Sequence, residues 1–557
     1  MKASKIFIYA AMSIATVSLT SCNDWLTDDA PGVSKLEDYL ANGKAAIEIT
    51  NGVYTPCQWE YGNSYYSEWF IGDIASDDAL KGGEGVTDGL DAYEIDNFKV
   101  NPTNTILLDY YRAKWQGIAR ANIAIHSVEN IEPDGDMSEN MKARLIGESR
   151  FMRAYYYFCL ARIYGGMPLV DFVIESNDQW GQSRASLEDT YKFIITDLEE
   201  AEKVLWLKSK YAQDDLGRAT KGAAQAMLLK AHLYLAGFLT QEGNTSEAAE
   251  HYKAARDWGK KVIDSNEYSL CPTYFDNFTL AGENGPESVF EVQYTENPEG
   301  DYGDGNDPGG HEGYTKGTFT VRLQRSRSDA VSSEDANGKK GDHGWGWNKP
   351  TQNLYNEYEP NDLRRDATIL NPTDDQIETP AQEIYCGNRY LNRKYAMYTD
   401  GEAGYTYHLA HDARGPLNYK MIRYADVLLM YAEACCETGD LSAAKDALNK
   451  VRARVSLPAF PYTATIQGAT VTFADNNQTD LRKAIRHERR VELAMEAIRW
   501  FDLVRWGIAK ETIDAYIAGE TATAKAEFGE FIKGKNELFP IPSKEIDLSH
   551  VEQNPGY

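Results

Sequence analysis

Apolar residues recur with helical spacing along much of the chain. The clearest run follows the pattern i, i+3, i+4 and i+7, at Phe151, Ala154, Tyr155 and Phe158. It ends at the glycine pair 165–166, with Pro168 two residues further on, and glycine followed by proline commonly marks the end of a helix. The pattern therefore predicts a helix from residue 151 that stops at this glycine pair.

Two other regions have the pattern of paired helices. In the first region, two apolar stripes flank a turn at residues 243–244; they are Ala224, Met227, Leu228, Ala231 and Leu235, then Ala248, Tyr252, Ala255 and Val262. The second region repeats this arrangement around a turn at 439–440, with Tyr424, Val427, Leu428, Tyr431 and Cys435, then Ala444, Ala447, Leu448 and Val451. The unit 424–455 has nearly the length of a tetratricopeptide repeat, although ordinary antiparallel helix packing is the alternative. Because such pairs bury their faces only against stacked neighbours, we expect one continuous scaffold.

The composition changes between these two regions. Residues 281–350 contain 13 of the 44 glycines of the chain, together with Trp345 and Trp347. The segment predicts long loops with short strands at 289–294 and 318–323. The predicted fold is therefore mainly α, a tetratricopeptide-like scaffold of helix pairs with a loop-rich central insertion and a few short strands.

The segment 487–507, with the sequence HERRVELAMEAIRWFDLVRWG, predicts one charged helix. Its apolar stripe comprises Val491, Ala494, Met495, Ile498 and Phe501. Opposite charges stand three residues apart, where they meet on a helix, in the pairs Arg489/Glu492, Glu496/Arg499 and Asp502/Arg505. Since the signs are interleaved, the pattern favours a helix locked against its neighbours over a basic binding patch.

Composition and charge narrow the class of protein. The chain has 557 residues, of which 42% are hydrophobic and 12% aromatic, too many for a disordered segment. Its 57 basic and 85 acidic residues give a net charge of −28. A surface of this sign repels phosphate backbones, so we expect no nucleic-acid partner.

Catalytic and metal-binding signatures are mostly absent from the sequence. It has no G-x-S-x-G, H-E-x-x-H or P-loop motif, and its cysteines lack the spacing of a zinc site or a disulfide scaffold. His408 and His411 lie in a glycine- and tyrosine-rich loop, where such a pair is more often incidental than metal-binding. Residues 304–307 (DGND) resemble a calcium loop, but Pro308 and Thr315 occupy ligand positions of an EF-hand. An EF-hand is excluded, an irregular surface calcium site stays open, and we expect no other cofactor.

The first 22 residues form a separate unit. Two lysines precede an apolar run at 6–19, which is typical of a secretory signal and too short to anchor the chain as a spanning helix. The run ends in Leu-Thr-Ser-Cys at 19–22, which resembles the bacterial lipobox, where the cysteine is acylated. The sequence predicts a lipoprotein signal peptide at 1–21, lipidation at Cys22, an acidic tether at 22–35 and anchoring to a membrane through the lipid.

Several motifs in one order make a resemblance specific. Besides the lipobox and the 487–507 segment, they are 72–79 (GDIASDDA), 115–122 (WQGIARAN), 148–169 (ESRFMRAYYYFCLARIYGGMPL), 423–434 (RYADVLLMYAEA), 539–542 (FPIP) and 553–557 (QNPGY). With these motifs the chain resembles the SusD/RagB family of outer-membrane lipoproteins. The resemblance implies four tetratricopeptide-like helix pairs and a shallow ligand face made by loops. It also implies a SusC-like TonB-dependent transporter as partner at the cell surface, a glycan or, in some members, a peptide as ligand, and no enzymatic activity.

By similarity to the family, two groups of residues would contact the ligand. The first follows the 72–79 motif and comprises Asp77, Asp78, Lys81 and Tyr93, and the second precedes Pro350 and Leu354 and comprises Tyr294, Tyr302, Trp345 and Trp347. The alternatives are that the aspartates stabilise a turn and that the tyrosines pack inward. The two glycine-flanked tryptophans are the hardest to explain as core residues, so we expect both to face outward. The aromatic stretch 59–69 is interpreted mainly as packing beneath the face.

These expectations combine into one functional hypothesis. We expect a cell-surface, lipid-anchored protein that captures glycans and delivers them to the transporter. The predicted organisation is an N-terminal part at 36–220 and a C-terminal part at 221–557, in one compact unit, with a ligand-face segment at 281–418. The alternatives are a peptide-binding protein of the same fold and a secreted glycoside hydrolase, for which the 85 acidic residues offer too many candidate pairs to choose from.

Overall fold

The structure is a computed structural model that describes residues 42–296, 317–327, 343–372, 389–398, 407–410, 414–475 and 477–557. Helices dominate and the strands are few and short, which confirms the predicted mainly α class. The longer helices are α3 (Gly43–Tyr54), α6 (Thr105–Asn130), α7 (Glu139–Tyr164), α8 (Leu187–Val204), α9 (Lys221–Gln241), α10 (Thr245–Asp264), α14 (Tyr424–Glu437), α15 (Leu441–Arg454), α16 (Gln478–Glu492) and α18 (Ala509–Gly519). The shorter ones are α4 (Trp69–Gly72), α5 (Leu90–Asp96), α11 (Thr320–Gln324), α12 (Gln352–Glu357), α13 (Leu363–Thr368), α17 (Arg499–Arg505), α19 (Ala522–Lys525) and α20 (Ser543–Ser549). Over this described part of the chain, no helix has the length and apolarity that crossing a membrane requires.

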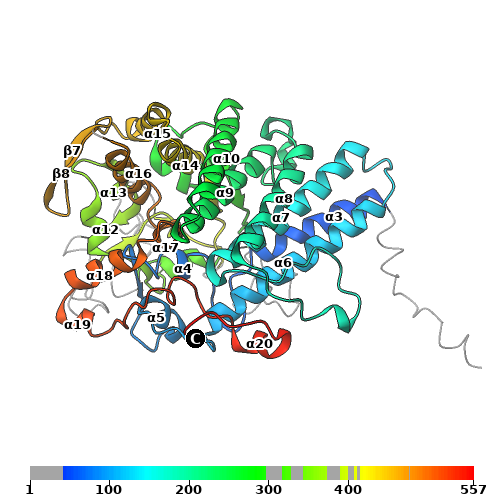
Figure 1. The fold of residues 1–557 in the computed structure, drawn as a ribbon, viewed down its shortest axis with the longest axis horizontal. Coiled ribbons are helices and arrows are strands. Elements are labelled where there is room, and N and C mark those ends of the chain that lie inside the picture. The colour runs from blue at the N-terminus through cyan, green and yellow to red at the C-terminus, as the bar shows by residue number, and fades with distance from the viewer. Residues whose placement is uncertain are drawn as a thin grey trace, which may run out of the picture.

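The helices stack in the order of the sequence. Each packs against the next from α6 to α10, α3 lies against α6 and α7, and α10 continues onto α14, which pairs with α15 (Figure 1). The predicted helix pairs are therefore confirmed as α9/α10 and α14/α15, and their apolar stripes are largely buried. Their turns pass through Gly243 and Gly439, with φ of 83° and 82°, a left-handed backbone that glycine adopts without steric cost. The predicted stop of α7 is confirmed at Gly165.

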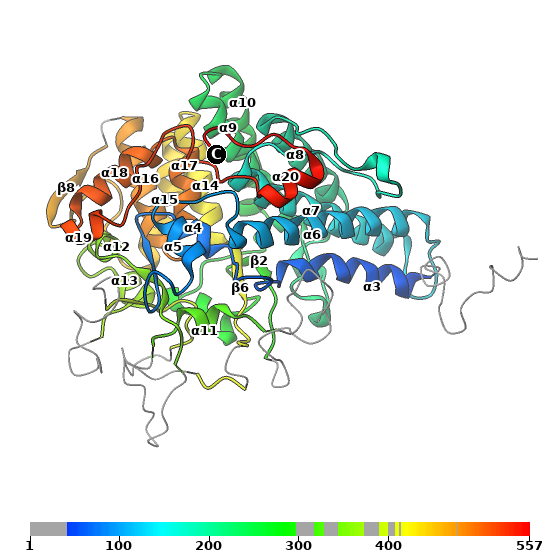
Figure 2. The same ribbon diagram turned by 90° about the horizontal axis from the view of Figure 1, so that it is seen from below.

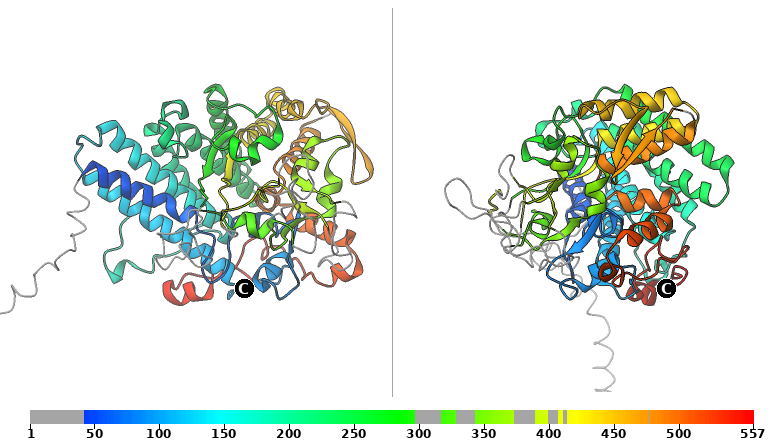
Figure 3. Two further views of the ribbon diagram at one scale, coloured as in Figure 1. Left: turned by 180° about the vertical axis from the view of Figure 1, so that it is seen from behind. Right: turned by 90° about the vertical axis from the view of Figure 1, so that its left-hand side faces the viewer.

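The described residues form four two-stranded antiparallel sheets, of which β1/β3 and β2/β6 join segments far apart in the sequence, whereas β7/β8 is a local hairpin. They pair β1 (Ala79–Gly82) with β3 (Trp347–Pro350), β2 (Ser288–Val292) with β6 (Tyr419–Arg423), β4 (Ile369–Leu370) with β5 (Leu391–Asn392) and β7 (Tyr462–Ile466) with β8 (Ala469–Phe473). Figures 2 and 3 show the central segments, coloured green to yellow-green, gathered on one side of the helical body. The sheet β1/β3 fixes the segment after the 72–79 motif to this central region.

One of the two predicted central strands is a helix. The strand at 289–294 is confirmed as β2, whereas 318–323 contributes to α11. The carboxylate of Glu60 accepts hydrogen bonds from the Phe319 N–H at 2.6 Å and from the hydroxyls of Thr318 and Thr320. This long-range carboxylate satisfies N-terminal donors of the helix, which no local sequence pattern reveals.

The charged segment 487–507 is not one continuous helix. α16 ends at Glu492 and α17 begins at Arg499, and between them Met495 and Ala497 have left-handed φ values of 62° and 59°. Two tertiary contacts impose this break. The Ala497 N–H donates to the carboxylate of Asp73 at 2.8 Å, and the backbone carbonyl of Ala497 packs closely on Gly72. The predicted apolar stripe is nevertheless buried throughout.

The charges of this segment form long-range ion pairs more than local ones. Of the three predicted pairs, Asp502 and Arg505 meet at 2.9 Å. Arg489 lies instead between Asp426 and Asp502. These side chains are almost fully buried, so the segment is locked to α14 as well as to itself.

Glu492 is the centre of a buried cluster of arginines. Its carboxylate pairs with Arg364 at 3.0 Å, with Arg423 at 2.6 Å and with Arg454. Burial alone would favour the neutral acid, but the three guanidinium groups hold the pKa of Glu492 well below its usual range. The cluster joins the central insertion, through α13, to the helix pair α14/α15.

A substitution at Gly72 tests the packing that breaks the charged segment. A Cβ at this position would overlap the backbone carbonyl of Ala497, which cannot move without disturbing the turn. We expect Gly72→Ala to lower the free energy of unfolding by about 2–3 kcal/mol or more, measured by chemical denaturation. The control is Gly519→Ala, because nothing lies within 4 Å of a Cβ there. Equal stability of the two variants would contradict the proposed cause of the break.

The pH dependence of stability tests the surroundings of His487. Burial opposes its charged form, but Nδ1 lies 2.9 Å from Glu357 and Nε2 lies 3.6 Å from Glu359, and together these interactions raise the pKa of His487 to about 9. A cation whose folded pKa exceeds its unfolded value of 6.5 contributes stability that is complete below pH 6.5 and is lost as the pH rises through about 9. We expect the wild type to lose up to about 3 kcal/mol over this window relative to His487→Gln. Parallel stability curves from pH 6 to 10 would refute the assignment.

Candidate functional site

Asp77 and Asp78 of the first predicted group are buried. Their exposed fractions are 2% and 0%. Asp77 pairs with Arg499 and Arg490, each at 2.8 Å, and Asp78 pairs with Arg490, also at 2.8 Å. The carboxylates therefore tie the segment before β1 to α16 and α17, and the expectation that they lie on an open ligand face is corrected in favour of a structural role.

Lys81 and Trp347 lie together beneath a loop. The ammonium of Lys81 donates to two backbone carbonyls of the loop at 82–89 and lies 5.4 Å from the centre of the Trp347 ring. Trp347 is only 5% exposed, and its Nε1 donates to Asp88 at 3.3 Å. Gly83 and Gly89, both with φ of 77°, face the indole so closely that a side chain at either position would collide with it. The expectation that both tryptophans face outward is therefore wrong for Trp347, because these glycines let the loop close over it.

The predicted tyrosines also differ in position. Tyr93 on α5 is 8% exposed, donates to Glu527 and accepts from Lys99 at 3.1 Å. Tyr294 follows β2 and faces a small internal cavity. Tyr302 lies outside the described residues, as do Cys22 and the 304–307 segment with its calcium prediction.

Trp345 is the predicted residue that contributes to a partly exposed aromatic surface. Its ring lies 5.1 Å from that of Tyr65 in an edge-to-face contact, and Tyr65 in turn lies 4.8 Å from Tyr61. Phe319, which is buried, packs against both tyrosines at centroid distances of 4.9 and 6.0 Å. We call Tyr61, Tyr65 and Trp345, all of intermediate exposure, the aromatic shelf.

The shelf is held by a tight hairpin. Tyr61 and Tyr65 face each other across an isolated β-bridge, and the Tyr66 N–H donates to the Glu60 carbonyl at 2.7 Å. The carboxylate of Asp109 on α6 accepts from the backbone N–H of Ser64 at 2.8 Å and from the side chain of Asn63 at the hairpin tip. The rings are thereby fixed before any ligand arrives, which lowers the entropy cost of binding.

Glu60 connects the hairpin to the second half of the shelf. Besides capping α11, it accepts from Ser67, and burial raises the pKa of its carboxyl group although four donors oppose that shift. On the far side of α11, the Trp345 N–H donates to the Arg322 carbonyl at 3.1 Å. One buried carboxylate thus positions both segments that carry the shelf.

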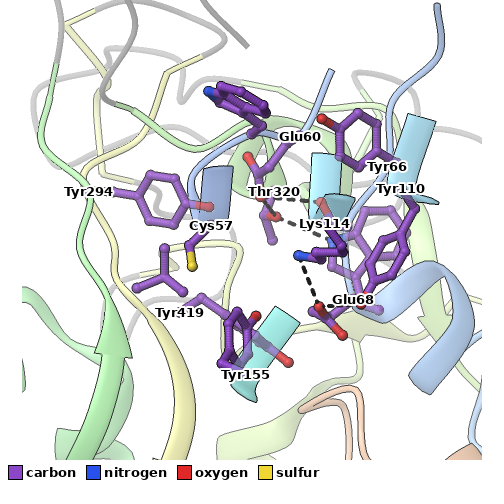
Figure 4. A pocket seen from close by; sticks show the side chains of 14 residues that line it. Cys57, Glu60, Tyr66, Glu68, Tyr110, Lys114, Tyr155, Tyr294, Thr320 and Tyr419 are labelled. Carbon is purple, nitrogen blue, oxygen red and sulfur yellow. Dashed lines mark hydrogen bonds and ion pairs between the residues drawn. The ribbon is translucent and has the colours of Figure 1, made fainter. Parts of the chain in front are cut away.

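Behind the shelf lies a small cavity of about 30 Å³ (Figure 4). Glu60 and Thr320 form one side of it, and Tyr294 and Cys57 form another. Glu68 lies opposite, paired with Lys114 at 3.4 Å. A volume of this size holds about one water molecule, so the cavity supports the shelf and has no room for a sugar.

The sequence assigned the shelf only in part. Trp345 was predicted, but Tyr61 and Tyr65 belong to the stretch 59–69 that was interpreted as packing beneath the face. For Trp59, Tyr66 and Trp69 that interpretation is confirmed, since these side chains are at most 4% exposed. The signal that distinguishes the two tyrosines is the Gly-Asn-Ser sequence between them, which is typical of a hairpin turn.

The described residues contain no group of three or more histidine, cysteine, aspartate or glutamate side chains arranged to hold a metal ion. The main feature of the site is a set of fixed, partly exposed rings. A charged rim stands beside it, where Arg327 lies 3.5 Å from Glu84 and passes next to Gly346. Such a surface can stack on a flat apolar face and form hydrogen bonds around it.

Two family models match the chain. Residues 286–557 match a model described as the SusD family, and residues 46–235 match one described as "starch-binding associating with outer membrane". Among curated proteins, a SusD-like protein of Bacteroides ovatus is 27% identical over 534 residues, covering 88% of this chain and 81% of that protein. SusD-like protein P2 of Formosa agariphila is 25% identical and is covered over 98% of both chains.

Solved structures agree with these matches. A laminarin-binding SusD-like protein superposes with a TM-score of 0.71 at 26% identity, covering 93% of this chain and 100% of the other. A SusD homologue of Bacteroides thetaiotaomicron has the same fold, with a TM-score of 0.74 at 23% identity, 94% of this chain and 99% of the other being covered. The order of motifs, the helix-pair scaffold and the matches to both halves of the chain lead to one conclusion: this protein belongs to the SusD/RagB family.

Proposed function

We propose that this protein binds neutral glycans on the aromatic shelf and holds them without cleaving them. The observation that carries the proposal is the shelf itself, in which Tyr61, Tyr65 and Trp345 are fixed at the surface by buried contacts. Pyranose rings present flat C–H faces that stack on aromatic side chains, and their hydroxyl rims exchange hydrogen bonds with polar neighbours. A shallow site of this kind grips its ligand briefly and can release it.

A related protein supports the choice of ligand class. The laminarin-binding SusD-like protein, at 26% identity, shares the fold over its whole length. The 30 Å³ cavity behind the shelf is too small for a peptide side chain of ordinary size, which favours a glycan over a peptide at this position. Laminarin is therefore the first polysaccharide to test.

The remaining parts of the proposal concern location and partner. We place the protein at the outer face of the outer membrane, anchored through an acylated Cys22, where it passes glycans to a SusC-like TonB-dependent transporter. The lipobox-like sequence at 19–22 supports the anchor. Membership of a family whose model description mentions association with the outer membrane supports the location.

Removing rings from the shelf tests the site. We expect Trp345→Ala and Tyr65→Ala each to weaken laminarin binding by about tenfold, because each removes a stacking surface worth about 1 kcal/mol or more. Affinity electrophoresis in laminarin-containing gels, followed by calorimetry, measures the change. The matched control is Trp258→Ala on α10, which removes a tryptophan of the same exposure class far from the shelf. Unchanged retention of both shelf variants, on laminarin and on every other polysaccharide that retards the wild type, would reject the site.

An activity assay separates binding from hydrolysis. We expect prolonged incubation of the pure protein with laminarin to release no reducing ends. The physical reason is that the two acidic residues that hold the shelf, Glu60 and Asp109, accept several hydrogen bonds within the hairpin and α11 and so do not face a sugar. Reducing ends that appear with the wild type and vanish in a Glu60→Gln variant would establish a hydrolase instead.

A further inference from the structure

A second, much larger cavity runs along α6. It has a volume of about 790 Å³, within the usual range for sites of small ligands. Its floor is α6, one wall is the segment 168–182, and α20 closes one side. We call it the α6 groove. It shares no residue with the aromatic shelf and meets the shelf hairpin only at the tip, through Asn63.

The wall segment is attached firmly to the helical body. The side-chain amide of Asn122 on α6 donates to the carbonyls of Val170 and Phe172, each at 3.0 Å. Its oxygen accepts from Arg153 at 2.9 Å, and Arg153 is paired with Asp197 on α8. The groove is therefore a preformed feature, not a gap under a loose loop.

Trp180 stands at the rim of this wall. Its side chain is 66% exposed, far more than a tryptophan of the core. The preceding 3₁₀ turn is closed by Gln179, whose side-chain oxygen accepts from the N–H groups of Glu175 and Ser176. Gln182 donates to the Gln179 carbonyl at 2.9 Å and fixes the chain on the other side. The indole is thus held at a fixed position in a cavity that Trp115 and Phe172 also line, and a contiguous apolar surface of this kind is typical of a ligand-binding groove.

The groove combines aromatic rings with amides and has no unpaired cation. Its rings are Tyr111, Trp115, Phe172 and Trp180, and its amide side chains are Asn63, Gln116, Asn122, Gln179 and Gln182. Arg112 is paired with Glu545 at 2.7 Å, and Asp109 is engaged by the shelf hairpin. Because the charges are matched locally, a phosphate, sulfate or acidic sugar finds no available counter-charge.

We propose that the α6 groove is a second carbohydrate-binding site, which takes a short neutral oligosaccharide with one sugar ring stacked on Trp180. Amides that donate and accept, next to rings, suit a ligand with hydroxyls around flat C–H faces. The aliphatic part of the lining, which includes Ile118 and Val170, would also accept an apolar peptide, and this is the competing occupant. The inference goes beyond the proposed function, because the groove is separate from the shelf.

The experiment uses the full mature chain with the shelf disabled by Tyr65→Ala and Trp345→Ala together. In this background we compare Trp180→Phe, which keeps a ring, with Trp180→Leu, which keeps apolar bulk without one. The probes are laminarihexaose, maltohexaose, cellohexaose and mannohexaose, titrated by calorimetry, and a pool of leucine-rich hexapeptides. Leu363→Ala is the control, because Leu363 is equally exposed, at 68%, and lies outside the groove.

We expect the shelf-disabled protein to bind at least one of the four hexasaccharides at a single site. Trp180→Leu should weaken that binding by about tenfold, Trp180→Phe by about threefold or less, and Leu363→Ala should leave it unchanged. Three outcomes would each overturn the proposal. The Trp180→Leu variant could bind the hexasaccharide as tightly as its parent, hexapeptides could bind and still bind in Trp180→Leu, or no hexasaccharide could bind once the shelf is disabled. Complete loss of binding on disabling the shelf leaves the shelf proposal standing and removes this one. If hexasaccharide binding is lost in Trp180→Leu but unaffected by disabling the shelf, this proposal stands and the shelf proposal falls.

Discussion

The arrangement of this protein depends on a set of buried charges at the end of α16. Glu488 and Glu492 together contact four arginines, one from α13, one from the end of β6 and two from α15. Each partner alone would be too costly to bury, but together they satisfy one another and hold elements more than a hundred residues apart in the sequence. Two arginines on either side of the break between α16 and α17 add a further long-range contact, because Arg490 and Arg499 both form ion pairs with Asp77. The charged residues of α16 and α17 therefore hold the N-terminal and C-terminal parts of the chain together.

The residues of this buried charge network are not part of the aromatic shelf. Asp77, Asp78 and Lys81 lie below the surface. The rings of the shelf pack on Phe319, and the carboxylates of Asp109 and Glu60 hold the segments that carry these rings. Glu60 connects the hairpin to α11, and its carboxylate accepts several hydrogen bonds there. The aromatic residues of the shelf can therefore be replaced without disturbing the buried charge network.

The parts of the structure that were predictable are those determined by local spacing. The apolar stripes of α9, α10, α14 and α15 repeat every three or four residues. The turns at Gly243 and Gly439 depend only on the residues next to them. Prediction failed where a distant side chain decides the outcome. Glu60 turns 318–323 into a helix start, Gly72 and Asp73 interrupt the charged helix, and Gly83 and Gly89 let a loop cover Trp347. Each of these partners lies too far along the chain from the segment it affects to be recognised from the local sequence pattern.

The same distinction explains why one of two similar tryptophans remains partly exposed. Trp345 and Trp347 have glycine neighbours and lie two residues apart, a spacing that would place both on the same side of a regular strand. Gly346 between them has a left-handed φ of 71°, which interrupts the extended chain just before β3. Trp347 belongs to β3, whose pairing with β1 brings the glycine-rich loop 82–89 over its ring. Trp345 precedes the strand, beyond the reach of that loop, and meets Tyr65 from a different part of the chain. Whether each of these two tryptophans is exposed therefore depends on the segment that packs over it. The glycine-rich sequence around them does not determine this by itself.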